Sequence, residues 1–190
     1  MKSLWIAFGA VVVLMLILGG CYFSGRNALI AQDENVNEHW SQIEVQLQRR
    51  ADLIPNLVSS VKGFAKHEEK IFTELASARA HLLSAKGPSE KAAAGAELNG
   101  ALGRLLAISE NYPDLKSNQN FIRLQDELAG TENRISVARG RYNNAVREFN
   151  RAIRSFPGSM FAGELDLKPR EYFEAPQGRA AVEKAPEVKF

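Results

Sequence analysis

The chain opens with an uninterrupted apolar segment, and the residues after it show helical periodicity. No residue from Leu4 to Phe23 is charged, and most positions in this run carry strongly apolar side chains. Because a helix rises about 1.5 Å per residue, roughly 20 such residues cross a hydrocarbon core of about 30 Å. The pattern predicts one N-terminal transmembrane helix, and we expect a membrane anchor over residues 1–26.

After the anchor, apolar residues recur at steps of three and four, which is the period of an amphipathic helix. The first stripe consists of Val36, Trp40, Ile43, Leu47, Ile54, Leu57 and Val61. Arg50 occupies the one position of this stripe that is not apolar. The stripe predicts a first long helix, about forty residues in length.

The strongest periodicity lies in the second half of the chain and alternates steps of three and four, as in a coiled-coil seam. Its members are Phe121, Leu124, Leu128, Thr131, Ile135, Ala138, Tyr142, Ala145, Phe149, Ala152 and Phe156. This seam predicts one helix from about Ser117 to Ser155, which ends before Pro157 because proline cannot continue a helix.

Two shorter helices are predicted between the long ones. The first extends from His67 to Lys86, and the second begins after Ser89, a favourable N-cap residue, and ends near Tyr112-Pro113. The order long, short, short, long predicts an all-α fold. We expect the transmembrane helix to be followed, over residues 27–157, by an elongated antiparallel four-helix bundle with two long and two short helices.

Helical periodicity stops after Pro157. Residues 158–176 contain several apolar and aromatic side chains around Pro169, and we expect them to form an extended strap that packs on the bundle. From residue 177 the composition is mainly Ala, Glu, Lys, Pro and Val, which is typical of disorder. We therefore predict a disordered tail over residues 177–190.

Charge and cysteine content narrow the possible functions. The 24 basic and 22 acidic residues are interspersed and leave a net charge of +2. No basic run of five or six residues is present, so nucleic acid is not an expected partner. The single cysteine, Cys21, excludes an intramolecular disulfide.

Two forms of anchoring are open at Cys21. The residue follows Ile17-Leu18-Gly19-Gly20, which resembles a bacterial lipobox and makes Cys21 a candidate for lipidation. The alternative is an uncleaved spanning helix, which we favour because the apolar run is long for a signal peptide and ends in the aromatic pair Tyr22-Phe23. Sparse flanking charges favour a soluble domain on the non-cytoplasmic side in both forms.

The first long helix contains the highly specific run Arg49-Arg50-Ala51-Asp52-Leu53-Ile54-Pro55-Asn56-Leu57. Further motifs are Tyr112-Pro113-Asp114-Leu115-Lys116, Glu132-Asn133-Arg134-Ile135 and Lys168-Pro169-Arg170-Glu171-Tyr172-Phe173. Over residues 27–173 the chain closely resembles the LemA family of bacterial membrane-anchored helical proteins. The resemblance implies an N-terminal anchor in the bacterial inner membrane and a helical bundle, but no settled activity.

The chain departs from the pattern of that family directly after the anchor. The family often shows Tyr-Asn there, and this chain has Arg26-Asn27. Members with a genuine lipobox place the cysteine nearly against the asparagine, whereas Cys21 lies six residues before it. This spacing further favours a single-pass spanning helix.

The sequence shows none of the common catalytic or metal-binding patterns. The three histidines, His39, His67 and His81, do not form an HExxH motif, and nucleophile-elbow and phosphate-loop glycine patterns are absent. We therefore expect no catalytic residues, no metal, no cofactor and a protein that is not an enzyme, and the sequence identifies no small-molecule ligand.

The most distinctive polar cluster consists of Arg49, Arg50, Asp52, Pro55 and Asn56. A guanidinium buried alone costs several kcal/mol, so we expect Arg50 to have an acidic partner on the last long helix. The candidates are Glu127, Glu132 and Glu148. Pro55 removes a backbone hydrogen bond, and we expect a kink there, with Asn56 pairing the freed groups. The cluster is either a buried network that sets helix register or a polar groove for a partner segment.

These observations favour a non-catalytic, membrane-anchored helical scaffold or adaptor. Besides the lipid bilayer, we expect it to assemble with a second copy or with an envelope protein, because part of the last seam has no evident cover from the short helices. The alternative is a small-ligand receptor or an enzyme with a polar site around Arg49, Arg50, Asp52 and Asn56. A concave pocket with convergent polar groups would favour that alternative.

Overall fold

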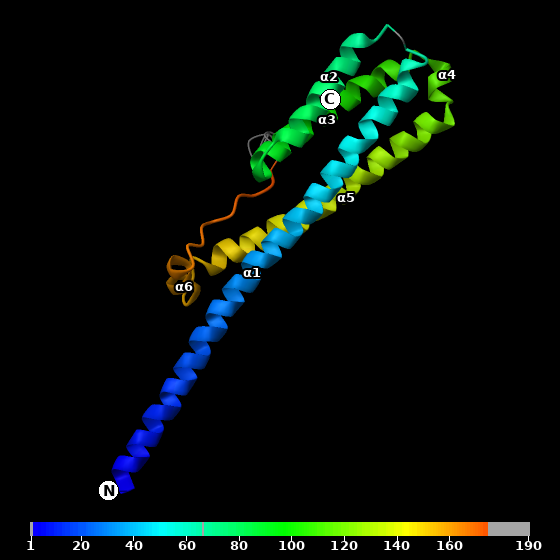
Figure 1. Ribbon diagram of the computed structural model, residues 1–190. Helices are drawn as coiled ribbons and strands as arrows, with labels where there is room; N and C mark the ends of the chain where they lie inside the picture. Colours follow the sequence, from blue (N-terminus) through cyan, green and yellow to red (C-terminus); the bar gives the residue numbers. More distant parts are fainter. Residues whose placement is uncertain (1, 66, 175–190) are drawn as a thin grey trace, which may run out of the picture. The chain divides into compact units, whose positions relative to one another are not determined.

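A computed structural model describes residues 2–65 and 67–174, and all regular secondary structure in these ranges is helical. The helices are α1 (Lys2–Lys62), α2 (Glu69–Ser84), α3 (Gly87–Ser109), α4 (Pro113–Lys116), α5 (Gln119–Ala152) and α6 (Gly158–Glu164), as Figure 1 shows. The prediction of an all-α fold is confirmed. The predicted disordered tail over residues 177–190 lies outside the described residues.

The described chain divides into two compact units. Unit 1 takes its residues from 1–39 and 144–170, and unit 2 takes its residues from 40–143 and from 171 onward. Helices α1 and α5 each contribute residues to both units.

Helix α1 is 61 residues long and includes the whole apolar run. Its most apolar part has a mean hydropathy of 2.0 and none of it is buried, so this helix is long and apolar enough to cross a membrane. Gly25 does not break the helix. A Cβ atom at residue 25 would lie 2.8 Å from Cε2 of Phe161. The glycine therefore allows the Phe161 side chain to pack closely against α1.

In unit 2, the apolar stripes predicted from the sequence form the core. Fully buried side chains come from each of the longer helices, among them Ile43, Ile54 and Leu57 of α1, Leu75 and Leu82 of α2, Leu98 and Leu105 of α3, and Phe121 of α5. Thr131 is also fully buried, and its hydroxyl donates to the carbonyl of Leu128 at 2.8 Å. The stripe of three-and-four spacing is therefore the buried face of α5.

The seam of α5 ends earlier than predicted. The helix stops at Ala152, and Phe156, the last predicted seam position, is 82% exposed. Pro157 keeps Phe156 out of the helix, because a proline disfavours helical geometry in the residue before it. Tyr142, Ala145 and Phe149 are buried, so the expectation that this end of the seam lacks cover is wrong.

Two short helices were not predicted. Helix α4 begins at Pro113, whose fixed φ suits the first turn of a helix, and it buries Leu115. Helix α6 replaces the extended chain that we expected at residues 158–164, because it can bury Phe161 and Ala162 on one side.

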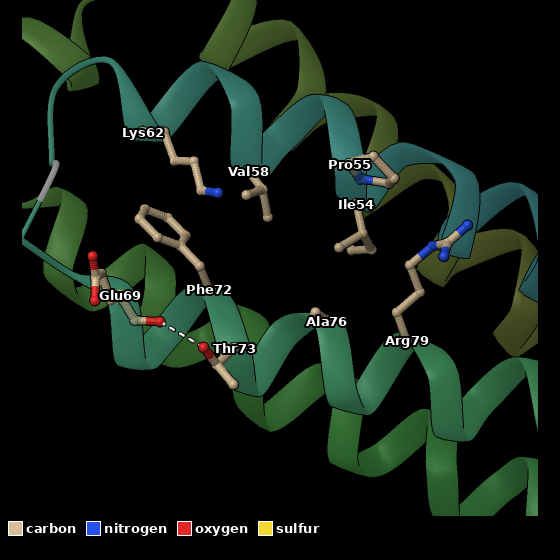
Figure 2. Close-up of a pocket in the computed structure, with 9 residues that line it drawn as sticks. All are labelled: Ile54, Pro55, Val58, Lys62, Glu69, Phe72, Thr73, Ala76 and Arg79. Atoms are coloured by element: carbon tan, nitrogen blue, oxygen red, sulfur yellow. Dashed lines mark hydrogen bonds between the residues drawn. The ribbon is translucent and has the colours of Figure 1, made fainter.

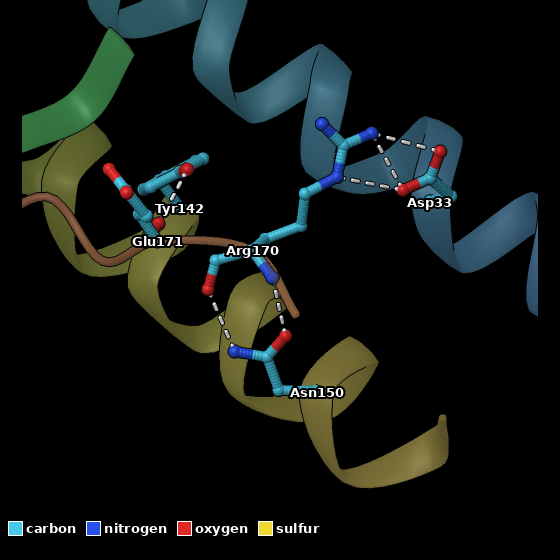
Figure 3. A network of polar contacts seen from close by, with 5 residues as sticks. All are labelled: Asp33, Tyr142, Asn150, Arg170 and Glu171. Carbon is cyan, nitrogen blue, oxygen red and sulfur yellow. Dashed lines mark hydrogen bonds and ion pairs between the residues drawn. The ribbon is translucent and has the colours of Figure 1, made fainter. Parts of the chain in front are cut away.

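Two asparagines of α5 hold the segment that follows α6. In unit 2, Asn143 accepts from the amide of Phe173 at 2.9 Å and donates to the carbonyl of Phe173 at 3.2 Å. In unit 1, Asn150 accepts a hydrogen bond from the amide of Arg170 at 2.8 Å and donates one to the carbonyl of Arg170 at 2.9 Å. Figure 3 shows the Asn150 pair, together with the bidentate ion pair that joins Arg170 to Asp33 on α1.

Phe173 is buried in unit 2 against the ring of Trp40. Its ring centroid lies 6.1 Å from that of Trp40, which in turn lies 5.5 Å from that of Tyr142. The hydroxyl of Tyr142 donates to the carbonyl of Glu171 at 2.8 Å (Figure 3). Residues 171–173 are therefore fastened to α5 by both side-chain packing and main-chain hydrogen bonds.

Replacing Asn143 with alanine is expected to open this segment locally. Losing two hydrogen bonds costs roughly 1–3 kcal/mol, so the amide of Phe173 should exchange with solvent at least about fivefold faster, as measured by hydrogen–deuterium exchange. Asn144→Ala is the matched control, because Asn144 is exposed and bonds only to Arg147 among the described contacts. Equal exchange at Phe173 in both variants would contradict the role of Asn143.

Candidate functional site: a groove beside Pro55

Unit 2 contains a groove of about 750 Å³ between α1 and α2 (Figure 2). Helix α1 contributes Ile54, Pro55, Val58 and Lys62, and α2 contributes Glu69, Phe72, Thr73, Ala76 and Arg79. We call this feature the Pro55 groove. Its apolar lining is flanked by one cation at each end, Lys62 and Arg79. The Lys62 ammonium lies 5.5 Å from the centroid of the Phe72 ring, a favourable cation–π distance.

Arg79 supplies the hydrogen-bond donor that Pro55 removes from α1. Proline has no backbone N–H, so Pro55 leaves the carbonyl of Ala51 without its helical donor. Nε of Arg79 donates to that carbonyl at 2.8 Å, and a terminal nitrogen of Arg79 lies 3.9 Å from the Asp52 carboxylate. Helix α1 continues through Pro55.

The expectation that Asn56 pairs the group freed by Pro55 is wrong. Asn56 is exposed, and its own carbonyl accepts from the hydroxyl of Ser60 at 3.0 Å. The donor comes instead from α2, because a side chain on a neighbouring helix can approach the exposed carbonyl from outside the helix. Sequence reasoning missed Arg79: a proline inside a helix signals that a carbonyl needs a donor, but it does not say which residue supplies it.

Arg50 is 8% exposed and forms an ion pair with Glu132 of α5. The prediction that Arg50 has an acidic partner on the last long helix is therefore confirmed, with Glu132 as the partner. Glu132 also accepts from Nδ2 of Asn99 at 3.5 Å, and a cavity of about 70 Å³ borders all three residues. Burial lowers the pKa of the Arg50 guanidinium to about 10.

This shift has a defined effect on stability at high pH. Below pH 10 Arg50 is charged in both states, so the cost of its burial is fully present. Between about pH 10 and 12.5 the folded state loses the proton first, the unfolded state binds more protons, and the contribution of Arg50 to stability rises with pH. We expect the stability of the native chain, measured relative to Arg50→Met, to rise over this range; a flat or falling difference would contradict the burial of the charge.

The other members of the predicted polar cluster do not converge with Arg50. Arg49 pairs with Glu127 of α5 at 3.2 Å, and both side chains are largely exposed. Asp52 accepts from Gln48 at 2.9 Å and lies beside Arg79 of α2. The cluster therefore divides between two faces of α1: its arginines pair with α5, whereas Asp52 lies near α2.

The histidines lie outside this arrangement. His81 of α2 lies 2.6 Å from the Glu97 carboxylate of α3, and both side chains are about half exposed. In the described parts of the chain, no group of three or more His, Cys, Asp or Glu side chains is placed to hold a metal ion.

The fold and the groove define a class: helical proteins in which a long N-terminal helix, apolar enough to span a membrane, continues into a helical domain. The chain belongs to the LemA family, whose family model matches residues 39–190. The magnetosome protein MamQ of Magnetospirillum gryphiswaldense is 30% identical over 183 residues, which cover 82% of this chain and 67% of MamQ. The protein LemA of Metamycoplasma hominis is 25% identical over 175 residues, covering 88% of this chain and 78% of that protein.

A second magnetosome relative gives the same comparison. MamQ 2 of Paramagnetospirillum magneticum is 30% identical over 183 residues, covering 82% of this chain and 67% of the relative. The matches cover most of this chain, so the similarity is to the helical domain as a whole.

Proposed function

We propose that this protein is a non-catalytic, membrane-anchored helical adaptor that holds a partner protein, either a second copy or another envelope protein, in the Pro55 groove. One observation carries the proposal: the groove is formed on α1, the helix that also contains the exposed apolar run. A segment bound in the groove is thereby attached to a chain segment that is long and apolar enough to cross a membrane.

The lining of the groove is suited to a protein segment. Ile54, Val58, Phe72 and Ala76 supply apolar surface, and Lys62 and Arg79 supply charge at the ends. Helix-in-groove recognition uses apolar anchors along one face of the bound segment. We expect the bound segment to be amphipathic and to carry an acidic residue near one end.

A regular packing of the helices in unit 2 supports the proposal. Contacts between α2 and α3 join Arg104 to Glu74 and His81 to Glu97, so the two helices run in opposite directions. Contacts between α1 and α5 join Arg49 to Glu127 and Trp40 to Tyr142, in the same antiparallel sense. We propose that α1, α2, α3 and α5 form an antiparallel four-helix bundle that keeps the groove rigid.

Photocross-linking in native membranes tests the adaptor function. A photoreactive residue at Ala76, which lines the groove, is expected to give a discrete cross-link to one protein or to a second copy. Ser77 is the matched control, because it is exposed on the same helix but does not line the groove. If Ala76 gives no discrete product, or gives the same products as Ser77, the groove is not the docking surface.

A small-ligand receptor is the second candidate, because the volume of the groove lies within the range of small-molecule pockets. A receptor site around Arg49, Arg50, Asp52 and Asn56 has less support, since those side chains do not converge. The names of the relatives, magnetosome protein MamQ and protein LemA, are not enzyme names, which agrees with a non-catalytic role. A metabolite that raises the thermal midpoint and prevents cross-linking from Ala76 would favour the receptor.

We further propose that α1 is an uncleaved single-pass anchor in the bacterial inner membrane, with the helical domain on the non-cytoplasmic side. Cys21 is exposed within the continuous helix α1. Intact-mass spectrometry of the protein from its native membrane is expected to show a chain that retains the residues before Cys21 and carries no lipid. A product that begins at Cys21 with added diacylglycerol would contradict this prediction and establish the lipoprotein form.

A further inference from the structure

Helix α6 packs on the side of α1 at the end of the apolar run. The ring of Phe161 lies 5.1 Å from the ring of Tyr22 at 80°, an edge-to-face contact. The hydroxyl of Tyr22 donates to Glu164 at 2.5 Å, and Nε of Arg26 lies 3.4 Å from the same carboxylate. At the other end of α6, Gly158 lies beside Leu29, so α6 runs antiparallel to α1.

These contacts determine the position of α6 along the axis of α1. The apolar run ends at Phe23, and the headgroup layer beyond a hydrocarbon core is about 5–7 Å thick on each side. At about 1.5 Å per residue, the contacts from Tyr22 to Leu29 cover roughly 10 Å of α1, beginning at the end of the run. When the run spans a bilayer, most of α6 lies beside the segment of α1 that passes through the headgroups.

The exposed side chains of this region suit a lipid surface. Phe156 is 82% exposed and Met160 is 64% exposed, so both offer apolar surface to a lipid environment. Tyr22 and Phe23 of α1 are also exposed, at the end of the apolar run, beside the C-terminal end of α6. Aromatic side chains are favoured at the boundary between the apolar core and the headgroups.

The charges around α6 agree with this location. The Glu164 carboxylate is held by both Tyr22 and Arg26, so α6 does not present an unpaired acid next to the membrane. Arg151 and Arg154, which precede α6, are exposed. Their positive charge lies on the water-facing side of α6, which favours approach to an anionic lipid surface.

We propose that α6 is a second membrane-contact element that lies in the headgroup layer of the bilayer spanned by α1, with Phe156 at the outer edge of that layer. The bound surface is lipid rather than protein, because the exposed apolar side chains of α6 lie beside the exposed apolar surface of α1, which lipid must surround. This inference rests on the anchoring in the proposed function. Contact at α6 to the side of α1 restricts the tilt and rotation of the anchor about its own axis.

Depth-dependent fluorescence quenching tests the proposal on the full chain in phosphatidylcholine–phosphatidylglycerol vesicles. In a Cys21→Ser background, single probes are attached after Met160→Cys, Phe156→Cys, Leu14→Cys or Glu34→Cys. Leu14 lies within the apolar run and reports anchoring by itself. Glu34 is an exposed residue of α1 eleven positions beyond Phe23 and serves as the unquenched control.

We expect a lipid with a shallow nitroxide to lower the fluorescence of the probes at Met160 and Phe156 at least twofold. A lipid with a deep nitroxide should lower it less. The Leu14 probe should be quenched mainly by the deep nitroxide. Quenching at Leu14 without quenching at Met160 and Phe156 would overturn this inference and leave the anchor intact. Absence of quenching at all positions would overturn the anchor and this inference together.

A second variant tests whether Met160 itself, rather than an attached probe, contacts the lipid. Met160→Asp is expected to reduce shallow quenching of the Phe156 probe about twofold and to leave the Leu14 probe unchanged, because a charge at residue 160 disfavours the apolar side of the layer. Ser159→Asp is the matched control: it adds the same charge at an adjacent exposed position of α6. Equal loss of quenching in both variants would overturn the assignment of Met160 as a lipid contact.

Discussion

Replacing Glu132 with alanine is expected to lower the free energy of unfolding by about 3 kcal/mol. The change leaves the Arg50 guanidinium charged and buried without its carboxylate partner, and breaking a buried pair in this way costs roughly 3–5 kcal/mol. The Glu132 side chain is 48% exposed, so water can approach the pair and the lower end of that range applies. Urea unfolding of the detergent-solubilised full chain measures the effect.

Two controls separate this effect from a general loss of charge. Glu127→Ala removes the partner of the neighbouring Arg49, but this pair is largely exposed, so a loss below about 1 kcal/mol is expected. Arg50→Met replaces the buried cation by an apolar side chain of similar length and should be neutral or mildly stabilising. Similar losses for Glu132→Ala and Glu127→Ala would show that burial of Arg50 does not govern the cost.

Arg79→Ala is expected to cost about 2 kcal/mol when Pro55 is present and much less when Pro55 is replaced by alanine. In the native chain, Arg79 is the donor to the carbonyl of Ala51 that Pro55 cannot supply. A hydrogen bond from a charged group contributes roughly 1.5–3 kcal/mol. In the Pro55→Ala background, the new backbone N–H pairs with Ala51, so Arg79 is no longer required for this purpose.

A double-mutant cycle over Pro55→Ala and Arg79→Ala measures this coupling directly. We expect a coupling free energy of about 1–2 kcal/mol. Arg104→Ala is the matched control, because Arg104 forms a side-chain pair with Glu74 at 3.0 Å and touches no carbonyl freed by proline. If Arg79→Ala and Arg104→Ala showed the same coupling free energy with Pro55→Ala, Arg79 would not be the replacement for the donor that Pro55 lacks.

The sequence alone was sufficient for the helical character, the apolar N-terminal helix and the buried faces of the long helices. Apolar side chains at steps of three and four can be buried together only on a helix, so Ile43, Ile54 and Leu57 of α1 and Phe121 and Phe149 of α5 are buried as predicted. The need of Arg50 for an acid on the last helix also followed from the sequence, because its place in the apolar stripe implies burial. These features depend on local periodicity and on the cost of desolvating a charge.

The tertiary structure decided which residues meet. Glu132 rather than Glu127 or Glu148 pairs with Arg50, because the registry of α1 against α5 is set by packing along both helices. Arg79 rather than Asn56 completes the helix at Pro55, since the donor must approach from a neighbouring helix. Helix α6 forms because Phe161 can pack at Gly25 and Glu164 can bond to Tyr22. Such contacts join residues far apart in the chain, so no local pattern specifies them, and they determine where the groove and helix α6 lie.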